Sequence, residues 1–421
     1  MKVLVVGAGG REHALSWKIS QSTLVTSVFV APGNGGTELE DHLTNVDIQA
    51  DDIEGLASFA LEQGIDLTIV GPEDPLVNGI TDRFNDLGLK CFGPSKGAAQ
   101  LEGSKEFMKD FLQRHHIPTA EYSSFSDTER AIEYVEQKGC PIVIKADGLA
   151  AGKGVTIAHT VEEAKEAIYQ SLESKVFGEA GKKIVIEEFL DGEEASFIVM
   201  TDGTNVIPFA SSQDHKALED NDKGPNTGGM GAYSPAPIVD EYVHEKIMNE
   251  IIFPTLKGLR KDGYKYCGFL YAGMMIDKNK KLKVLEFNCR FGDPETQPIM
   301  MRLKSDLASL CDQACDDNLI EQPLEWDSRK AIGVVLAARG YPHGYAKGKD
   351  ITNIPSEKDD LKIFHAGTKI ESNSLKSNGG RVLCVTSLGD SVESAQNKAY
   401  DAISEIEWED AFYRKDIGYR A

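Results

Sequence analysis

Residues Ile144 to Val155 read IKADGLAAGKGV, an apolar strand-like start followed by a glycine-rich segment with two lysines. A P-loop needs four residues between its glycines and a Ser or Thr after its lysine. Here three residues separate Gly148 from Gly152, and Gly154 follows Lys153, so the hydroxyl that would hold magnesium is missing. The glycines still let successive backbone N–H groups converge on one anion, and a lysine adds positive charge. We therefore expect a phosphate-binding loop outside the P-loop class, with an ordinary glycine-rich turn as the alternative.

Length and composition describe a globular, acidic chain. Its 421 residues suffice for about two to four domains. The 67 acidic and 45 basic residues give a net charge of −22, which argues against a nucleic-acid surface because such surfaces are basic. No apolar run reaches the ~18 residues of a membrane span, and the apolar run in MKVLVVGAGG is too short for a signal peptide. The seven scattered cysteines form no CxxC pair, so we expect a cytoplasmic chain.

The segment up to about residue 100 alternates strand and helix patterns. Strands are predicted at KVLVVGAGG, VTSVFVAPGNGGT, DLTIVGPEDPL and KCFGPS, and helices at REHALSWKISQS and IEGLASFALEQGI. This alternation predicts a doubly wound parallel sheet. Ligands bind at the carboxyl ends of the strands in such sheets. Those ends carry Gly9, Gly10 and Arg11, then Asn34, Gly35 and Gly36, then Gly71, Pro72 and Glu73.

The motif GAGGREH raises the alternative of a dinucleotide-binding fold. Gly7 and Gly9 fit that fingerprint, but Glu12 stands where the third glycine is needed. The second strand ends in Ala31-Pro32-Gly33, where an acidic residue would meet the ribose. Arg11 and the following helix N-terminus suit a substrate phosphate instead. We expect a phosphate-binding domain, with a Rossmann-type NAD(P) oxidoreductase and a ligand-free turn as alternatives.

A second unit begins near Ser104. GSKEFMKDFLQRHHIP predicts a helix capped by Ser104, PIVIKADG a strand, TVEEAKEAIYQSL a helix, and KKIVIEEFLDGEEASFIVMTDG two strands. GPNTGGMGAYSP is too irregular for a regular element, so we expect a functional loop there. After about residue 325, strands at KAIGVVLAARG, LKIFHAGTKI and GGRVLCVTSLG precede a long final helix.

The predicted hairpin GFLYAGMMIDKNKKLKVLEFNCRFGDPE ends in a polar cluster. Side chains two apart on a strand share a face, so Glu286 and Asn288 should point the same way, beyond Leu282 and Val284. A carboxylate and an amide at the end of an apolar strand are costly unless something binds there. Such oxygen ligands suit Mg²⁺. The alternative is an exposed strand end with hydrated polar groups.

Further charged groups belong to the same constellation. Lys105 and Lys145 precede the glycine loop, the acidic residues of IVIEEFLDGEE follow it, and Arg290 comes last. Lysines and a glycine loop hold phosphates, and the carboxylate–amide pair holds magnesium. The set predicts a nucleoside triphosphate bound between two small lobes. A nucleotide-binding protein without catalytic activity is the alternative.

The sequence resembles the ATP-grasp ligases, and within them the phosphoribosylamine–glycine ligase (glycinamide ribonucleotide synthetase) family of purine biosynthesis. The similar blocks are, in order, GGREHAL, APGNGGT, KADGLAAGKGV, EEFLDGEE, QDHK, GPNTGGMGAYSP and LEFNCRFGDPE, and they extend over essentially the whole chain. The resemblance implies an α/β fold with an N-terminal doubly wound parallel-sheet domain at 1–101, a two-lobed ATP-grasp region at 102–325 with a small lid lobe at about 122–191, and a small C-terminal α+β domain at 326–421.

The resemblance also implies a reaction. Glycine would be joined to 5-phosphoribosylamine through a glycyl phosphate, giving glycinamide ribonucleotide, ADP and phosphate. The partners would be these small molecules and ATP, with no nucleic acid and no membrane, and we expect a monomer. Another ATP-grasp carboxylate–amine ligase is the alternative.

The resemblance assigns roles to individual residues. The ATP site would comprise Lys105, Lys145, Gly148, Gly152, Lys153, Gly154, Glu187, Glu188, Phe189, Leu190, Glu194 and Asn226, and the Mg²⁺ or Mn²⁺ site Glu286 and Asn288. The phosphoribosylamine site would comprise Gly10, Arg11, Glu12, Asn34, Gly35, Gly36 and Glu73. Asp214, Lys216 and Arg290 would act on glycine and its acyl phosphate. Lys153 would lie on a lid that closes over the phosphates.

The chain departs from the family pattern at two points. The family usually has Arg after QDHK, where this chain has Ala217, so a phosphate contact is either missing or supplied elsewhere. Many ATP-grasp relatives carry a metal-binding acid on the strand before Glu-x-Asn. The segment GFLYAGMM has none, which leaves the number of metal ions open.

Overall fold

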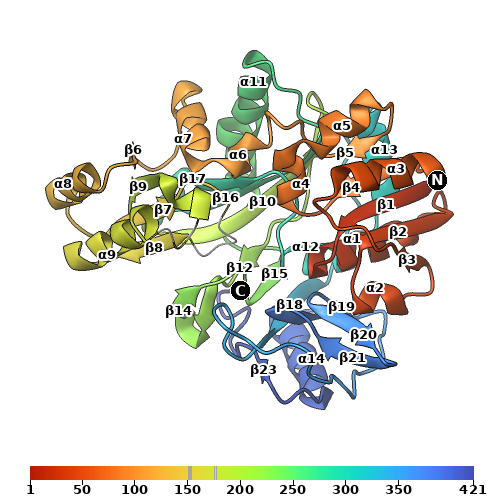
Figure 1. Ribbon diagram of the computed structural model, residues 1–421. Helices are drawn as coiled ribbons and strands as arrows, with labels where there is room; N and C mark the ends of the chain where they lie inside the picture. The colour runs from red at the N-terminus through yellow and green to blue at the C-terminus, as the bar shows by residue number, and fades with distance from the viewer. Residues whose placement is uncertain (150–153, 175, 177) are drawn as a thin grey trace.

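The computed structural model describes residues 1–149, 154–174, 176 and 178–421 (Figure 1). Its N-terminal unit is a parallel sheet in the order β3-β2-β1-β4-β5. Successive side chains of β1 point to opposite faces of the sheet and are buried in two different cores. Leu4 and Val6 pack with helix α3, whereas Val3 and Val5 pack with helix α1. The elements are β1 (Lys2–Gly7), α1 (Gly10–Ser20), β2 (Ser27–Pro32), α2 (Gly35–Leu39), β3 (Leu43–Asn45), α3 (Ile53–Gln63), β4 (Leu67–Val70), α4 (Glu73–Asn78), α5 (Ile80–Asp86) and β5 (Cys91–Phe92).

The lid lobe projects from one side of the molecule (Figure 1). It is an antiparallel sheet in the order β6-β9-β7-β8, and helices α8 and α9 pack on it through a separate small core. The elements are β6 (Tyr122–Phe125), α8 (Thr128–Lys138), β7 (Ile142–Ala146), β8 (Val155–Ala158), α9 (Val161–Leu172) and β9 (Ile184–Glu188).

The central sheet has the order β11-β10-β16-β17. Helices α7, α10 and α11 contribute to the same core as alternate residues of β10 and β16. The other residues of these strands pack toward β1 and helices α12 and α13. The elements are α6 (Gln100–Gly103), α7 (Lys105–Arg114), β10 (Glu193–Thr201), β11 (Val206–Pro208), α10 (Glu241–Ile247), a π-helical turn (Met248–Ile252), α11 (Phe253–Lys261), β16 (Gly268–Ile276), β17 (Leu282–Asn288), α12 (Thr296–Arg302) and α13 (Leu307–Cys315).

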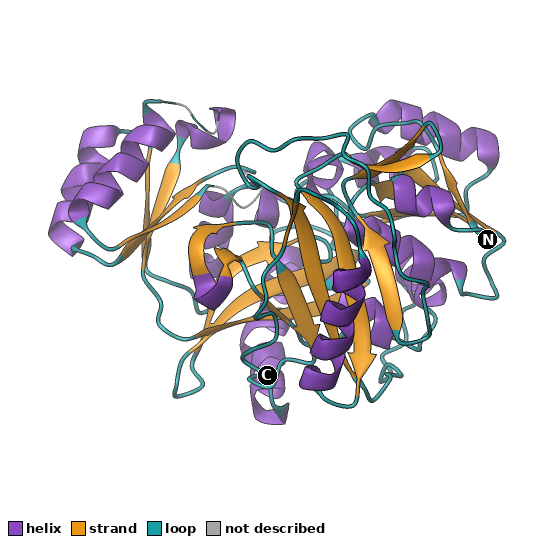
Figure 2. Cartoon of the chain, turned by 90° about the horizontal axis from the view of Figure 1, so that it is seen from below, coloured by secondary structure: helices purple, strands orange, loops and turns teal. Residues whose placement is uncertain are grey.

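The C-terminal sheet also contains strands from the middle of the chain. Its order is β12-β15-β18-β22-β19, with β23 paired to β18, and helix α14 packs against it (Figure 2). The elements are β12 (Gln213–Asp214), β15 (Gly231–Ser234), β18 (Lys330–Ala338), β19 (Leu361–His365), β22 (Arg381–Gly389), α14 (Val392–Glu405) and β23 (Ala411–Phe412), with the hairpins β13 (Ala217–Glu219)–β14 (Lys223–Asn226) and β20 (Thr368–Glu371)–β21 (Ser374–Ser377). The chain between β12 and β15 is therefore anchored to C-terminal strands.

The predicted fold class is confirmed, and helix α7 begins after Ser104, whose Oγ accepts from Phe107 N at 3.1 Å. Three details of the prediction are wrong. Strand β3 was missed because its three residues have no apolar pattern. The segment GPNTGGMGAYSP is not one irregular loop, because its two ends belong to strands β14 and β15. Strand β15 pairs with β18, which lies about a hundred residues later in the sequence. LKIFHAGTKI divides into β19 and β20. No helix in the described part of the chain has the length and apolarity needed to cross a membrane.

Candidate active site

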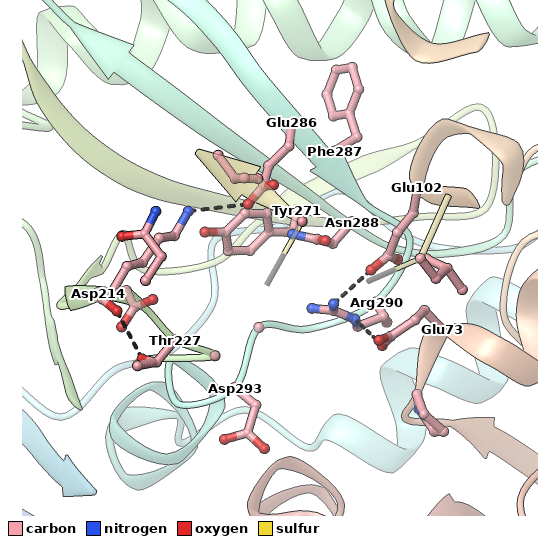
Figure 3. A pocket seen from close by; sticks show the side chains of 18 of the residues that line it. Glu73, Glu102, Asp214, Thr227, Tyr271, Glu286, Phe287, Asn288, Arg290 and Asp293 are labelled. Carbon is pink, nitrogen blue, oxygen red and sulfur yellow. Dashed lines mark hydrogen bonds and ion pairs between the residues drawn. The ribbon is translucent and has the colours of Figure 1, made fainter. Parts of the chain in front are cut away.

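A cavity of about 1000 Å³ lies where the N-terminal sheet, the lid lobe, the central sheet and the C-terminal strands meet (Figure 3). Helix α4 supplies Glu73, β9 supplies Glu187, β17 supplies Glu286 and β22 supplies Arg381. Residues far apart in the sequence therefore share one cavity.

On the lid side of the cavity, two lysines contact one buried glutamate, and a third lysine binds a backbone carbonyl. Lys145 Nζ lies 3.0 Å from Glu187 Oε1, and Nζ of the fully buried Lys109 lies 2.8 Å from Glu187 Oε2. Burial lowers the pKa of Lys109 to about 8, although the attraction of Glu187 opposes this. Lys105, at the start of α7, donates to Gly148 O at 3.0 Å. Lys105 and Lys145 line the cavity and offer it the fixed cations that phosphates need.

Glu286 and Asn288 line the cavity from β17, as their shared face predicts. The expectation that this face continues from Leu282 and Val284 is wrong. Those two side chains are buried in the core, and the pairing of β17 with β16 skips Leu285. One unpaired residue turns the following side chains to the opposite face of the strand. The bulge therefore aims the carboxylate and the amide into the cavity.

Lys216 lies between two carboxylates. Its Nζ contacts Glu194 Oε1 and lies 3.2 Å from Glu286 Oε1. The attraction of Lys216 lowers the pKa of Glu286 to about 2 despite burial. The charged carboxylate and the carbonyl of Asn288 are hard oxygen donors, which fits a divalent cation such as Mg²⁺. The described residues contain no group of three or more His, Cys, Asp or Glu side chains suited to a metal. The fit is therefore to an ion that completes its shell with substrate oxygens and water.

Arg290 forms a charge network at the opposite end of the cavity. Its Nε lies 3.0 Å from Glu73 Oε2 and its Nη2 lies 2.6 Å from Glu102 Oε1 (Figure 3). Burial raises the pKa of Glu102 to about 7, although Arg290 opposes this. Burial also acts to raise the pKa of Glu73, but Arg290 and Arg11 outweigh it and lower that pKa to about 2. The two glutamates hold the guanidinium in place at the cavity wall.

Glu12 fills the glycine turn after β1. Arg11 Nε donates to Glu12 Oε1 at 2.5 Å, and Gly9 N donates to Glu12 Oε2 at 2.6 Å. A dinucleotide fold uses this turn for a pyrophosphate. Because a protein carboxylate already accepts from Gly9 N, the geometry argues against an NAD(P) site.

Asp214 and Glu295 form a second acidic group at the cavity, beside Tyr271. Glu295 Oε1 accepts from Ser196 Oγ at 3.1 Å, whereas the buried Oδ1 of Asp214 has no hydrogen-bond partner among the described residues. Burial, together with repulsion from Glu295, raises the pKa of Asp214, and burial raises the pKa of Glu295. Such a pair holds a proton or accepts a cationic group at neutral pH.

An apolar wall completes the lid side of the cavity. It consists of Val143, Ile157, Phe189, Met275 and Leu285. Flat aromatic ligands favour such surroundings, with a few polar groups to orient them.

Most of the predicted site residues line the cavity. They are Arg11, Glu12, Glu73, Lys105, Lys145, Gly154, Glu187, Glu188, Phe189, Leu190, Glu194, Asp214, Lys216, Asn226, Glu286, Asn288 and Arg290. Gly152 and Lys153 lie outside the described residues. Their roles stay predictions.

Five predicted residues do not line the cavity in the described structure: Gly10, Asn34, Gly35, Gly36 and Gly148. Asn34 caps α2, since its Oδ1 accepts from Gly36 N at 2.8 Å, and its Nδ2 donates to His365 O at 2.8 Å. A Cβ at Gly36 would lie 2.5 Å from His365 Cβ. In this structure the motif APGNGGT therefore joins the N-terminal unit to β19.

Several cavity residues were missed by sequence reasoning: Glu102, Thr227, Gly228, Tyr271, Asp293, Glu295, Tyr341, Tyr345 and Arg381. The polar run FGDPE was a usable signal for Asp293 and Glu295. Arg381 begins a strand that reads as ordinary core, so only its position in the C-terminal sheet brings it to the cavity.

Ala217 lies beside an arginine from the end of the chain. Ala217 O accepts from Arg414 Nη1 at 3.1 Å, and Arg414 is fully buried. The same guanidinium lies 2.9 Å from Asp222. Arg414 thus holds the β13–β14 hairpin, but it does not line the cavity in the described structure.

Three models of one protein family together match nearly the whole chain. Models of the phosphoribosylglycinamide synthetase N domain, ATP-grasp (A) domain and C domain match residues 1–102, 103–296 and 331–420. The phosphoribosylamine–glycine ligase of Escherichia coli K12 is 61% identical over 423 residues, covering 100% of this chain and 99% of that protein. The ligase of Vibrio vulnificus CMCP6 is 60% identical over 422 residues, covering 100% and 98%.

Solved structures agree. The crystal structure of the phosphoribosylamine–glycine ligase of Thermotoga maritima has a TM-score of 0.86 and 35% identity, covering 99% of this chain and 100% of that chain. A biotin carboxylase of Campylobacter jejuni has a TM-score of 0.77 at 16% identity, covering 99% and 93%, which shows a shared fold. By sequence and structure, the chain belongs to the phosphoribosylglycinamide synthetase family of phosphoribosylamine–glycine ligases.

Proposed function

We propose that the chain joins glycine to 5-phosphoribosylamine and cleaves ATP to ADP and phosphate, which gives glycinamide ribonucleotide. The observation that carries this proposal is the arrangement of charges in the cavity. Lys105, Lys145, the oxygen donors Glu286 and Asn288, and Arg290 all line it, and the charges of both lysines act on Glu286. An enzyme that moves a phosphoryl group to a carboxylate needs such cations and metal ligands around the phosphates.

The first step would activate glycine. A carboxylate is a poor electrophile, so an amine does not attack it directly. One glycine carboxylate oxygen attacks the γ-phosphorus of ATP, the bond to ADP breaks, and glycyl phosphate forms. Lys105 and Lys145 position the phosphates and neutralise their charge. Mg²⁺ or Mn²⁺ held by Glu286 and Asn288 would supply further charge neutralisation on the phosphate oxygens.

The second step would form the amide. The amine nitrogen of phosphoribosylamine attacks the acyl carbon, the bond to phosphate breaks, and the nitrogen loses a proton. Asp214 would accept the glycine ammonium group, and Lys216 and Arg290 would stabilise charge on the acyl phosphate. Arg11 would bind the sugar phosphate. Lys153 would close over the phosphates and help to keep water out.

The remaining ATP contacts would be made to the adenine, the ribose and the phosphates by residues of different strands and loops. Residues 187–190 would border the adenine next to the apolar wall, Glu194 would accept from the ribose hydroxyls, and Asn226 would contact the phosphates. The main-chain groups of Gly148 and Gly154 would flank the phosphates where β7 ends and β8 begins.

The direct test is release of ADP by the purified chain with ATP, glycine and freshly formed phosphoribosylamine. We expect ADP, phosphate and glycinamide ribonucleotide in equal amounts, with loss of product when glycine, the amine or the divalent cation is omitted. Titration with Mg²⁺ and Mn²⁺ separately identifies the preferred ion. Product formation without glycine, or none with all substrates present, would refute the proposal.

We also propose that the chain is a cytoplasmic monomer with domains at 1–101, 102–325 and 326–421. Light scattering coupled to size-exclusion chromatography, cell fractionation and limited proteolysis test these three points. A dimer mass, a membrane-bound fraction, or first cleavage within a domain would each contradict the corresponding point.

A further inference from the structure

Arg381, the first residue of β22, is bound by backbone carbonyls of two separate loops. Its Nη1 donates to Gly228 O at 2.7 Å, to Gly229 O at 3.4 Å and to Asp293 O at 2.5 Å. Its Nη2 lies 3.5 Å from Asp293 Oδ2. One guanidinium therefore joins the loop after β14 to the loop after β17.

The loop after β14 belongs to the phosphate side of the cavity. It follows Asn226, and Thr227 and Gly228 themselves line the cavity. Tyr341 OH accepts from Gly228 N at 3.0 Å, so a second C-terminal side chain holds the same residue. A Cβ at Gly228 would lie 3.1 Å from Arg381 Cζ, which shows how closely the backbone approaches the guanidinium.

The loop after β17 belongs to the side of the cavity proposed for phosphoribosylamine. Asp293 Oδ2 accepts from Arg11 N at 3.3 Å, and its Oδ1 accepts from Gln297 Nε2 at 2.8 Å. Asp293 thus connects Arg381 to the start of helix α1. Glu295, two residues later in the chain, is the acidic residue that lines the cavity together with Asp214.

We propose that Arg381 is a positioning residue for amide formation. It keeps the phosphate-side loop (residues 226–229) and the amine-side loop (residues 292–295) at a fixed separation, so that the amine of phosphoribosylamine meets glycyl phosphate before water does. This inference rests on the proposed function. Lysine cannot replace the arginine fully, because it is a point charge, whereas a guanidinium spreads five donors over a planar fork.

The test compares Arg381→Lys with wild type by measuring glycinamide ribonucleotide formed per ADP released. We expect the apparent KM for phosphoribosylamine to rise about tenfold while that for ATP changes less than about twofold, as for loss of a charged contact at one subsite. Glycine-dependent ADP release should persist, and the product-to-ADP ratio should fall below one because glycyl phosphate is lost to water.

Arg302→Lys is the matched control. Arg302 also donates to backbone carbonyls, those of Arg329 at 2.9 Å and Asp327 at 3.3 Å, but it is buried and does not line the cavity in the described structure. This variant should lower the unfolding midpoint without changing the product-to-ADP ratio. A lowered ratio in Arg302→Lys would show that the ratio reports general damage, and would overturn the inference.

Two results with folded Arg381→Lys would overturn the inference: a wild-type ratio, or equal rises in the apparent KM for all three substrates. If Arg381→Lys does not fold, the product-to-ADP ratio is measured on Tyr341→Phe instead. This variant removes only the hydroxyl that accepts from Gly228 N. A lowered ratio in Tyr341→Phe supports the inference, and an unchanged ratio overturns it. Absence of ligase activity in the wild type would instead refute the proposed function, and the inference with it.

Discussion

Replacing Glu102 with glutamine should change how the stability of the protein depends on pH. Glu102 is 8% exposed, receives a hydrogen bond from Cys289 N at 2.7 Å, and contacts Arg290. Burial raises its pKa from 4.5 to about 7 in the folded protein. Glutamine has nearly the same shape and does not titrate, so Glu102→Gln removes this proton-binding group without leaving a cavity.

The sign and size follow from proton binding. Below pH 4.5 both the folded and the unfolded chain hold the proton, and the stabilisation by the raised pKa is fully present. Between pH 4.5 and about 7 the unfolded chain loses the proton and the folded chain keeps it, so the wild type loses stability. At about 1.4 kcal/mol for each pH unit, the loss amounts to about 3 kcal/mol. The unfolding free energy of Glu102→Gln minus that of wild type should therefore rise by about 3 kcal/mol from pH 4.5 to 8.

Urea unfolding at pH 5, 6, 7 and 8 measures this difference, with circular dichroism and tryptophan fluorescence as independent probes. Glu62→Gln is the control, because Glu62 is exposed on α3. Its difference from wild type should stay within about 0.5 kcal/mol. A difference between Glu102→Gln and wild type that is constant over the same pH range would refute the raised pKa.

Three further predictions test the reaction. Glu286→Gln keeps the shape of the proposed metal ligand and removes its charge, so we expect loss of turnover with an unchanged circular dichroism spectrum, and wild-type activity at limiting Mg²⁺ would refute the metal assignment. Arg11→Ala should weaken phosphoribosylamine binding by ~1.5–3 kcal/mol, a more than tenfold rise in its apparent KM, with little change for ATP; equal rises for both would indicate general damage to the domain. Glycine labelled with oxygen-18 in its carboxylate should pass one label per turnover into inorganic phosphate, and Lys153→Ala should slow this transfer without changing the destination of the label; label found only in the product and in glycine would exclude glycyl phosphate.

Short-range signals in the sequence determined much of the fold. The Ser104 cap, the alternating strands and helices before residue 100, and the β16–β17 hairpin were all predicted and are present. Caps, turns and periodic burial depend on residues a few positions apart, so a single sequence records them. Local patterns also led to Lys145, which precedes a glycine loop suited to phosphate, and to Glu286, since a carboxylate that ends an apolar strand needs a partner.

Tertiary structure alone decided how the cavity is completed. The bulge at Leu285 reverses the face on which Glu286 lies, because pairing with β16 sets the register. Arg381 reaches Gly228 across 153 positions and Asp293 reaches Arg11 across 282. Contacts at such separations leave no periodic trace in the sequence, since they depend on which sheet each strand joins. Local sequence patterns therefore identified the candidate reactive residues. The packing of the sheets against one another determined which residues position those reactive residues.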